Sequence, residues 1–190
     1  SGIGFAAAAR FAAEGAKVVI TGRRQAELDD AARKIGQAVV GIRADSASLS
    51  DLDGLFSEVK RRFGRIDVLF VNAGGGSMAP LGSITEEQFD DAFNRNVKGA
   101  IFTVQKALPL LADGASVILN GSTIASKGNM GLSVYSASKA AIGALARNWI
   151  LDLQGRNIRI NTLSPGFTKT EGLLAAAGPD PEAQQNFLGF

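Results

Sequence analysis

The sequence predicts an α/β fold built on a doubly wound parallel sheet. Short, continuous apolar runs alternate with longer stretches of helical periodicity, which is the pattern of strands buried on both faces and joined by helices. The composition agrees, because 46% hydrophobic and 20% charged residues are typical of a globular protein. No linker, repeat or low-complexity tract interrupts the alternation, so we expect the 190 residues to form one domain.

The expected elements follow from this alternation. Each strand is a short apolar run, and each helix repeats its apolar residues with a period near 3.6. In chain order they are the helix Phe5–Glu14, the strand Lys17–Gly22, the helix Gln25–Ile35, the strand Ala38–Ile42, the helix Ser50–Phe63, the strand Ile66–Val71, the helix Thr85–Leu111, the strand Ser116–Asn120, the helix Val134–Leu153 and the strand Asn157–Leu163.

Several helix boundaries carry start or stop signals. Thr85 with Gln88 three residues later predicts a capping box, and Ser50 with Asp53 is a weaker version of it. Glycines suited to a positive φ follow four of the expected helices, at Gly15, Gly36, Gly64 and Gly155.

Both ends of the sequence predict that the natural chain continues. The segment Ser1-Gly2-Ile3-Gly4 leads straight into a helix, whereas a parallel sheet normally feeds such a glycine-rich turn from a strand. The last residues, GPDPEAQQNFLGF, contain no closing strand. We therefore expect the fold to be incomplete at both ends.

Two missing residue types exclude several kinds of chemistry. Without Cys there is no disulfide framework, thiolate zinc site, iron–sulfur cluster or cysteine nucleophile. Without His there is no Ser-His-Asp triad and no histidine metal site. Catalysis must therefore use Ser, Thr, Tyr, Lys, Asn or carboxylates, and we expect no metal.

Charge and hydropathy argue against two kinds of partner. The net charge is only +2, so the sequence pI of about 9.1 does not indicate a nucleic-acid-binding surface. No run approaches the roughly 20 apolar residues that span a bilayer, and the first residues lack the basic lead-in of a signal peptide. We expect no nucleic acid and no membrane, and a cytoplasmic location fits.

Two segments near the start suit a dinucleotide. Gly2 and Gly4 open a helix, where the absence of side chains lets backbone N–H groups approach a pyrophosphate. Arg23 and Arg24 follow the next strand, at the place where an acidic residue would bind a ribose 2′-OH and an arginine would bind a 2′-phosphate. A plain glycine turn and two solvated arginines are the alternatives.

A second glycine-rich segment follows the third expected strand. Val71-Asn72-Ala73-Gly74-Gly75-Gly76 lies at a carboxyl end, where open α/β sheets bind ligands. Its three glycines predict a backbone that passes close to a bound molecule. A flexible turn is the alternative interpretation.

The strongest catalytic pattern combines a serine with a tyrosine and a lysine. Tyr135 and Lys139 are four residues apart on one helix, hence on one face. A neighbouring ammonium favours the phenolate and so lowers the tyrosine pKa towards neutrality. Ser122 follows the strand Ser116–Asn120, so its hydroxyl and the Tyr/Lys pair can converge on one reacting carbonyl.

These motifs together resemble the short-chain dehydrogenase/reductase family over nearly the whole chain. SGIG is similar to the second half of the family's TGxxxGxG loop, and VNAGG resembles its NNAG motif with Val71 in place of the first Asn. The other matching segments are the Tyr-x-x-x-Lys motif and the family's serine, its helix asparagine and the PG segment that packs against nicotinamide. The matching residues are Gly2, Ile3, Gly4, Asp45, Asn72, Ala73, Gly74, Asn96, Ser122, Tyr135, Lys139, Pro165, Gly166, Thr168 and Thr170.

The resemblance implies a role for each catalytic residue. Tyr135 would be the acid/base, while Lys139 would bind the nicotinamide ribose and depress the tyrosine pKa. Ser122 would hydrogen-bond the substrate oxygen. Asn96 would interrupt its helix and hold a water of a proton relay. Asp45 would pair with the adenine amino group.

The resemblance further implies a first strand before Ser1 and a C-terminal helix and strand after Phe190. It also implies a homotetramer in which two long helices pack between subunits, because these helices carry apolar residues around much of their circumference. The residues concerned are Ile101, Phe102, Val104, Trp149 and Ile150.

The expected cofactor is NADP(H), with NAD(H) left open. Gly22 stands where a carboxylate would favour NAD, and Glu27, the nearest acid downstream, is not expected to reach back. The expected substrate is a small carbonyl or alcohol compound, because the segments Ser77–Gly82 and Gly128–Val134 are small, neutral and mildly apolar. The alternatives are a 3-oxoacyl-thioester (acyl-carrier-protein) reductase and a non-catalytic NADP(H)-binding regulator.

Overall fold

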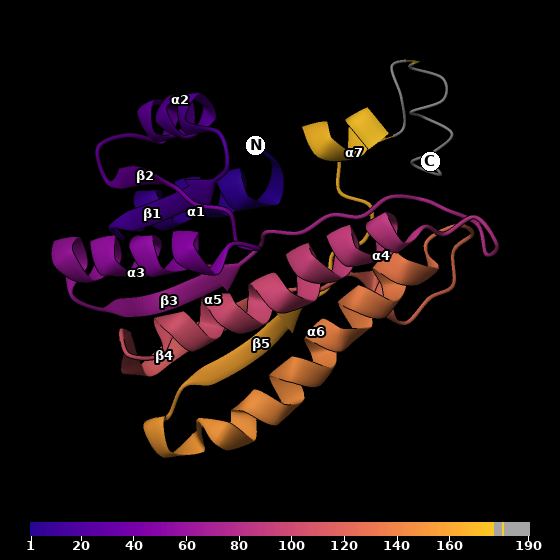
Figure 1. The fold of residues 1–190 in the computed structure, drawn as a ribbon. Helices are drawn as coiled ribbons and strands as arrows, with labels where there is room; N and C mark the ends of the chain where they lie inside the picture. The colour runs from indigo at the N-terminus through magenta and orange to yellow at the C-terminus, as the bar shows by residue number, and fades with distance from the viewer. Residues whose placement is uncertain (177–179, 181–190) are drawn as a thin grey trace. The chain divides into compact units, whose positions relative to one another are not determined.

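The computed structural model describes residues 1–176 and 180, and they form two compact units (Figure 1). Ser1–Ile42 and the segment from Gly166 onward make up the terminal unit, and Arg43–Pro165 makes up the central unit. Both alternate helices with strands, so the fold is of the α/β class and Rossmann-like, as the sequence predicts. The single domain over 1–190 stays a prediction.

The terminal unit is a two-stranded sheet with helices packed on its first strand. The two strands are hydrogen-bonded to each other, and at the start of both strands the Val18 N–H donates to the Ala38 carbonyl at 2.8 Å. Helices α1 and α2 both contact β1. The elements are α1 (Gly2–Ala13), β1 (Val18–Gly22), α2 (Gln25–Ile35), β2 (Val39–Arg43, whose last residue opens the central unit) and α7 (Glu171–Ala176).

The central unit holds a parallel sheet in the order β3-β4-β5. Its regular elements are α3 (Leu49–Phe63), β3 (Ile66–Val71), α4 (Glu86–Phe93), α5 (Gly99–Ala107), β4 (Leu111–Asn120), α6 (Ser133–Asp152) and β5 (Arg159–Leu163). A π-helical turn, Asn94–Lys98, lies between α4 and α5, and 3₁₀ turns occupy Thr123–Ala125 and Gln154–Arg156.

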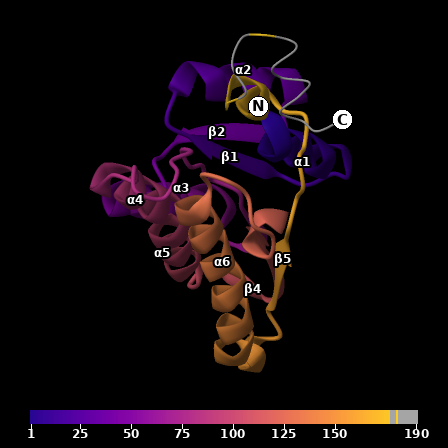
Figure 2. The same cartoon turned by 90° about the vertical axis from the view of Figure 1, so that its right-hand side faces the viewer.

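The core of the central unit lies between this sheet and the helices beside it. Helix α5 packs on β3, and α6 packs on β4 and β5, so both cover one face of the sheet (Figure 2). Val117 and Leu119 of β4 and Ala107 of α5 are fully buried, and Leu52 of α3 is nearly so. Their burial fixes the strand ends on which the site is built.

The expected long helix Thr85–Leu111 is wrong as one element. It is interrupted by the π-helical turn and ends at Ala107, because Pro109 lacks the N–H that would continue it. Strand β4 then begins at Leu111, five residues before the expected start at Ser116. Its first half contains Asp113-Gly114, a sequence typical of turns, and its pairing with β3 is irregular there.

The capping predictions are partly confirmed. Thr85 and Gln88 form the reciprocal capping box, whereas α3 is capped by Ser48 and not by Ser50. Ser48 Oγ accepts from the Asp51 N–H at 3.3 Å, so α3 begins one residue earlier than expected. Of the four glycines, Gly155 is not at a positive φ and Asn157 takes the left-handed position (φ 53°) instead, while Gly15, Gly36 and Gly64 behave as predicted.

The structure differs from the expected elements at both ends of the described residues. Helix α1 begins at Gly2 rather than Phe5, so the glycine pair lies inside its first turn, with Gly2 at φ 62°. Helix α7 has no counterpart among the expected elements. The last residues, for which the sequence predicts no closing strand, lie outside the described residues apart from Asp180.

Candidate active site

The site begins where β3 and β4 end side by side. Because parallel strands finish at the same edge of a sheet, Asn72 and Asn120 meet there, and Asn120 Nδ2 donates to Asn72 Oδ1 at 2.9 Å. The Asn120 carbonyl accepts from Lys139 Nζ at 2.8 Å. Asn120 Oδ1 is buried and has no hydrogen-bond partner among the described residues. Sequence reasoning missed Asn120, whose polar side chain at a strand end was the available signal.

Ser122 and Tyr135 are two of the expected catalytic residues, and the structure places them close together. Ser122 caps the 3₁₀ turn Thr123–Ala125, where its Oγ accepts from the Ile124 N–H at 3.3 Å. Its side chain also hydrogen-bonds that of Tyr135, which lies in the first turn of α6. Burial raises the pKa of Tyr135 above its usual 10.0, and the hydrogen bond from Ser122 offsets only part of this rise.

Lys139 is a buried ammonium one turn further along α6. The residue is only 5% exposed, and this desolvation lowers its pKa from 10.5 to about 8. Nζ lies 5.8 Å from the centroid of the Tyr135 ring. The expected net lowering of the Tyr135 pKa is not found in this state of the protein, because the effect of burying the phenol is larger than the effects that lower this pKa.

Asn96 lies in the π-helical turn and ties three segments together. It is 2% exposed, and its Nδ2 donates to the Gly75 carbonyl and to Ser138 Oγ, both at 2.8 Å. Its Oδ1 accepts from the Gly75 N–H at 2.9 Å. The amide therefore pairs with both backbone groups of Gly75. The helix interruption expected at Asn96 is present, and the water expected there stays a prediction.

The glycines after β3 are required by the side chains behind them. A Cβ on Gly74 would lie 2.7 Å from Asn96 Oδ1 and 3.1 Å from Lys139 Nζ. A Cβ on Gly76 would lie 2.8 Å from Tyr135 Cδ2. The backbone of this segment thus packs directly on the side chains of Asn96, Lys139 and Tyr135, and neither Gly74 nor Gly76 has room for a side chain. That it also passes close to a bound molecule stays a prediction.

Asp45 and Pro165 belong to the edge of the central unit. Asp45 follows β2, and its Oδ1 accepts from the Ala47 N–H at 3.0 Å. Asp51 Oδ2 accepts from the Asp45 N–H at 2.9 Å, so the loop is held at both ends. The Pro165 carbonyl accepts from the Thr123 N–H at 3.0 Å, which brings the start of the PG segment to the residue after Ser122.

The terminal unit brings together residues from distant parts of the sequence that we expect to bind the cofactor. A Cβ on Gly2 would lie 3.4 Å from Thr170 Cγ2, so the helix opening and the PG segment adjoin. Thr170 Oγ1 accepts from the Leu173 N–H at 3.2 Å at the start of α7, and Thr168 Oγ1 donates to the Gly166 carbonyl at 3.2 Å. Ile3 and Gly4 lie in the first turn of α1.

The two arginines after β1 differ in their surroundings. Arg24 is the N-cap residue of α2 but makes no side-chain cap bond, and it forms an ion pair with Glu27. That Glu27 does not reach the ribose position at Gly22 stays a prediction. Arg23 is exposed and makes no ion pair with any described residue. Arg23 is therefore the guanidinium available to an anionic ligand.

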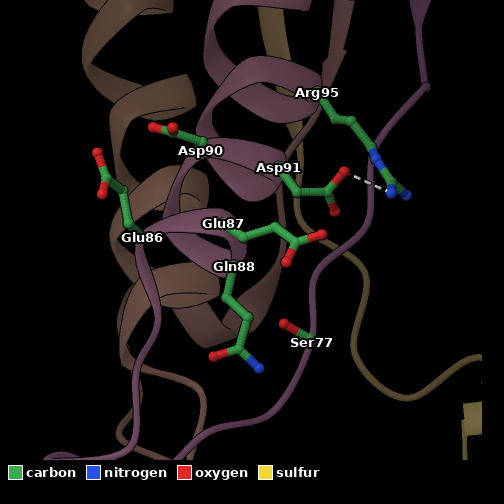
Figure 3. Close-up of a pocket in the computed structure, with 7 residues that line it drawn as sticks. All are labelled: Ser77, Glu86, Glu87, Gln88, Asp90, Asp91 and Arg95. Carbon is green, nitrogen blue, oxygen red and sulfur yellow. Dashed lines mark ion pairs between the residues drawn. The ribbon is translucent and has the colours of Figure 1, made fainter.

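An open groove adjoins the catalytic segment in the central unit. Its volume is about 780 Å³, and it is lined by Ser77, by residues of α4 and by Arg95 of the π-helical turn (Figure 3). Ser77 follows Gly76, which lies against the Tyr135 ring. The groove is acidic, since Arg95, its only basic residue, is paired with Asp91 at 2.5 Å. The lining residues are Ser77, Glu86, Glu87, Gln88, Asp90, Asp91 and Arg95.

Two kinds of feature are absent from the described part of the chain. No helix there combines the length and apolar character needed to cross a bilayer. No group of three or more Asp, Glu, His or Cys side chains gathers among those residues as a metal site would require.

The chain is similar to known proteins over most of its length. The profile of the family described as short chain dehydrogenase matches residues 1–177. Oxidoreductase asL5 of Sarocladium schorii is 49% identical over 99% of this chain and 78% of its own length. Galactitol 2-dehydrogenase of Agrobacterium fabrum is 35% identical over 90% of this chain and 68% of its own length.

Two solved structures share the fold. A mutant short-chain dehydrogenase/reductase from Serratia marcescens superposes with a TM-score of 0.88 at 28% identity, covering 100% of this chain and 84% of its own. A short chain dehydrogenase from Burkholderia cenocepacia, solved in complex with NADP, gives 0.82 at 34% identity, covering 88% and 71% respectively.

Proposed function

This chain belongs to the short-chain dehydrogenase/reductase family, and on that premise we propose that it transfers a hydride between NADP(H) and a small carbonyl or alcohol substrate. The observation that carries the proposal is the hydroxyl pair of Ser122 and Tyr135 beside the buried ammonium of Lys139. A half-buried proton donor, a second hydroxyl and a buried cation can act together on one carbonyl oxygen.

In the reducing direction Tyr135 donates the proton. Its raised pKa keeps the phenol protonated at neutral pH, so the acid is ready before the reaction starts. Ser122 hydrogen-bonds the same substrate oxygen. The Lys139 ammonium, 5.8 Å from the ring, stabilises the phenolate that forms when the proton leaves. Asn96 keeps the Gly75 backbone against these side chains.

The residues fit a nicotinamide nucleotide. Lys139 Nζ has three N–H groups, and Asn120 is its only hydrogen-bond acceptor among the described residues, which leaves N–H groups for ribose hydroxyls. Within the terminal unit, Gly2 opens α1 beside Thr170 with no Cβ in the way of a phosphate. When bound, the nicotinamide ring supplies or accepts the hydride.

We propose NADP(H) as the preferred cofactor. Arg23 is the residue that supports this preference, because it is exposed and forms no ion pair with any residue that the structure describes, whereas Arg24 is paired with Glu27. A guanidinium binds a 2′-phosphate with charge-assisted hydrogen bonds, and Gly22 offers no carboxylate to repel that phosphate. The likeness to a dehydrogenase solved with NADP agrees with this choice.

The acidic groove lined by Ser77 and α4 argues against an acyl-carrier-protein substrate. Such a partner is acidic, and the groove is lined by four carboxylates, Glu86, Glu87, Asp90 and Asp91 (Figure 3). Like charges would repel the carrier at this surface. A neutral alcohol or ketone meets no such barrier, and the similarity to a galactitol dehydrogenase supports that class.

A homotetramer built on α5 and α6 is part of the proposal. Ile150 is 45% exposed, and neighbouring Leu151 is 66% exposed, so α6 presents apolar surface that a partner would cover. Val104, expected on this surface, is 3% exposed and belongs to the core instead. Light scattering of the full-length protein should give a tetramer mass at micromolar concentration, and a monomer would refute the assembly.

The experiment that tests the proposed function is an NADPH oxidation assay of the full-length protein with neutral ketones, activated ketones and a 3-oxoacyl thioester. We expect turnover with at least one neutral ketone and a lower rate with the thioester. Cofactor binding without turnover on any of them would favour a non-catalytic regulator. A preference for the carrier-linked thioester would overturn the substrate class.

A further inference from the structure

Ser138 is a buried polar residue to which the proposed reaction gives no role. It lies between Tyr135 and Lys139 on α6 and is fully buried, at 0% exposure. Among the described residues, Asn96 and Lys139 are the other buried polar or charged side chains, and both belong to the site. A hydroxyl placed at this depth needs partners on both its donor and acceptor sides.

Both partners of Ser138 belong to the site as well. Its hydroxyl donates to the Tyr135 carbonyl at 2.7 Å and accepts from Asn96 Nδ2 at 2.8 Å. A serine hydroxyl has one hydrogen, so its donor capacity is committed to the first turn of α6. A side chain that bonds back to the preceding turn influences the local bend of a helix.

The same chain of bonds continues beyond Asn96 to the segment that covers the catalytic side chains. Asn96 pairs with the N–H and the carbonyl of Gly75. Gly74, on one side of Gly75, lies in close contact with Lys139, and Gly76, on the other side, lies in close contact with Tyr135. Ser138 therefore sits where the helix, the π-helical turn and the glycine segment are joined.

We propose that Ser138 is a positioning residue, whose hydroxyl orients the Asn96 amide on Gly75 and fixes the turn of α6 that separates Tyr135 from Lys139. The inference rests on the proposed function, since it concerns the placement of that reaction's acid. Removing the hydroxyl leaves one Asn96 N–H buried without an acceptor, which favours rotation of the amide away from its present partners.

The test compares Ser138→Ala and Ser138→Cys with wild type in two measurements on the full-length protein. The first is hydrogen exchange of the Gly75 amide, which reports the bond to Asn96 Oδ1 and needs no turnover. The second is kcat with the KM for NADPH. Ile142→Val is the matched control, because Ile142 is buried on the same helix, 3% exposed, and its truncation weakens packing alone.

We expect Ser138→Ala to speed Gly75 exchange and lower kcat by about tenfold each, with KM for NADPH changed less than about twofold. Ser138→Cys, a weaker donor and acceptor, should fall between, and it serves as the decisive variant if the alanine protein does not fold. Ile142→Val should change neither quantity.

Two results would overturn the inference. Gly75 exchange in both Ser138 variants equal to that of Ile142→Val would show that the hydroxyl does not hold the amide. Faster exchange with an unchanged kcat would show that it plays no part in the reaction. If wild type reduces no ketone at all, the proposed function fails, and the exchange measurement still decides whether Ser138 positions the glycine segment.

Discussion

The central unit and the terminal unit hold the expected site residues in opposite environments. In the central unit Asn96, Ser138 and Lys139 are at most 5% exposed and are bound to one another or to neighbouring backbone. In the terminal unit the corresponding charged residues lie in water, and the side chain of Arg24 is 73% exposed.

This contrast separates two tasks. Proton transfer needs groups whose pKa values and distances are fixed, which burial and shared hydrogen bonds provide. Discrimination between two cofactors that differ by one phosphate needs only a charge at the right place, and an exposed arginine suffices. Changes in the central unit should therefore act on turnover, and changes in the terminal unit on cofactor choice.

The largest effect is expected from Tyr135→Phe, which removes the proton donor. Loss of a general acid typically costs about 10²–10⁴-fold in rate. Steady-state kinetics should show that loss in kcat, while fluorescence titration should give an NADPH affinity close to that of wild type. A mutant that keeps more than a tenth of the wild-type kcat would remove Tyr135 from the mechanism.

Lys139→Met should abolish activity and yet stabilise the fold at neutral pH. The folded-state pKa of about 8 lies below the usual 10.5, so the cost of burying the charge is fully present below pH 8 and is relieved as the pH rises to about 10.5. This cost is on the order of 3 kcal/mol. The gain in stability of the mutant is smaller than that, because the methionine also loses the hydrogen bond to the Asn120 carbonyl.

Urea unfolding of wild type and Lys139→Met at pH 7 and pH 10 measures this cost. The stability advantage of the mutant should shrink at the higher pH. An advantage that does not change with pH would mean that Lys139 carries no desolvation cost.

Arg23→Ala should change cofactor choice with little effect on kcat. Wild type is expected to prefer NADPH over NADH by at least about tenfold in kcat/KM, which corresponds to about 1.4 kcal/mol. The mutant should narrow this ratio and make it less sensitive to salt, because the contact is ionic. Arg24→Ala is the matched control and should leave the ratio nearly unchanged, since Glu27 already pairs with Arg24. Equal kcat/KM values for the two cofactors in wild type would show that both arginines merely face water.

The smallest effect concerns a helix cap in the central unit. Ser48→Ala should lower the free energy of unfolding by about 1 kcal/mol, because Ser48 Oγ accepts from the Asp51 N–H. Ser50→Ala should cost much less, since Ser50 does not cap α3. Denaturant unfolding of the two variants compares them directly, and equal losses would contradict the assignment of the cap.

The sequence predicts most elements of the fold because their signals are local. Apolar runs mark the strands, and Thr85 with Gln88 marks a helix start that the structure confirms. The start of α3 was ambiguous, because Ser48 and Ser50 each have an Asp three residues later. Nothing local distinguishes them, and only the bonds from Ser48 and Asp51 to their neighbours select one.

The site is predictable in its members and not in its electrostatics. Ser122, Tyr135 and Lys139 follow from spacing, and the structure brings them together. The direction of the Tyr135 pKa does not follow, because it depends on burial by residues distant in sequence. Ser138 was missed for the same reason, since its two bonds become visible only when Asn96, 42 positions away, is brought against it.

The most direct test of the account follows the hydride itself. Full-length protein is incubated with a neutral ketone and NADPH deuterated at the nicotinamide carbon that donates, and the alcohol product is analysed by mass spectrometry. Wild type should give an alcohol with one deuterium per molecule, and Tyr135→Phe should give at least about 100-fold less of this labelled alcohol in the same time. An alcohol without deuterium, or equal amounts of labelled alcohol from the two proteins, would contradict the proposed mechanism.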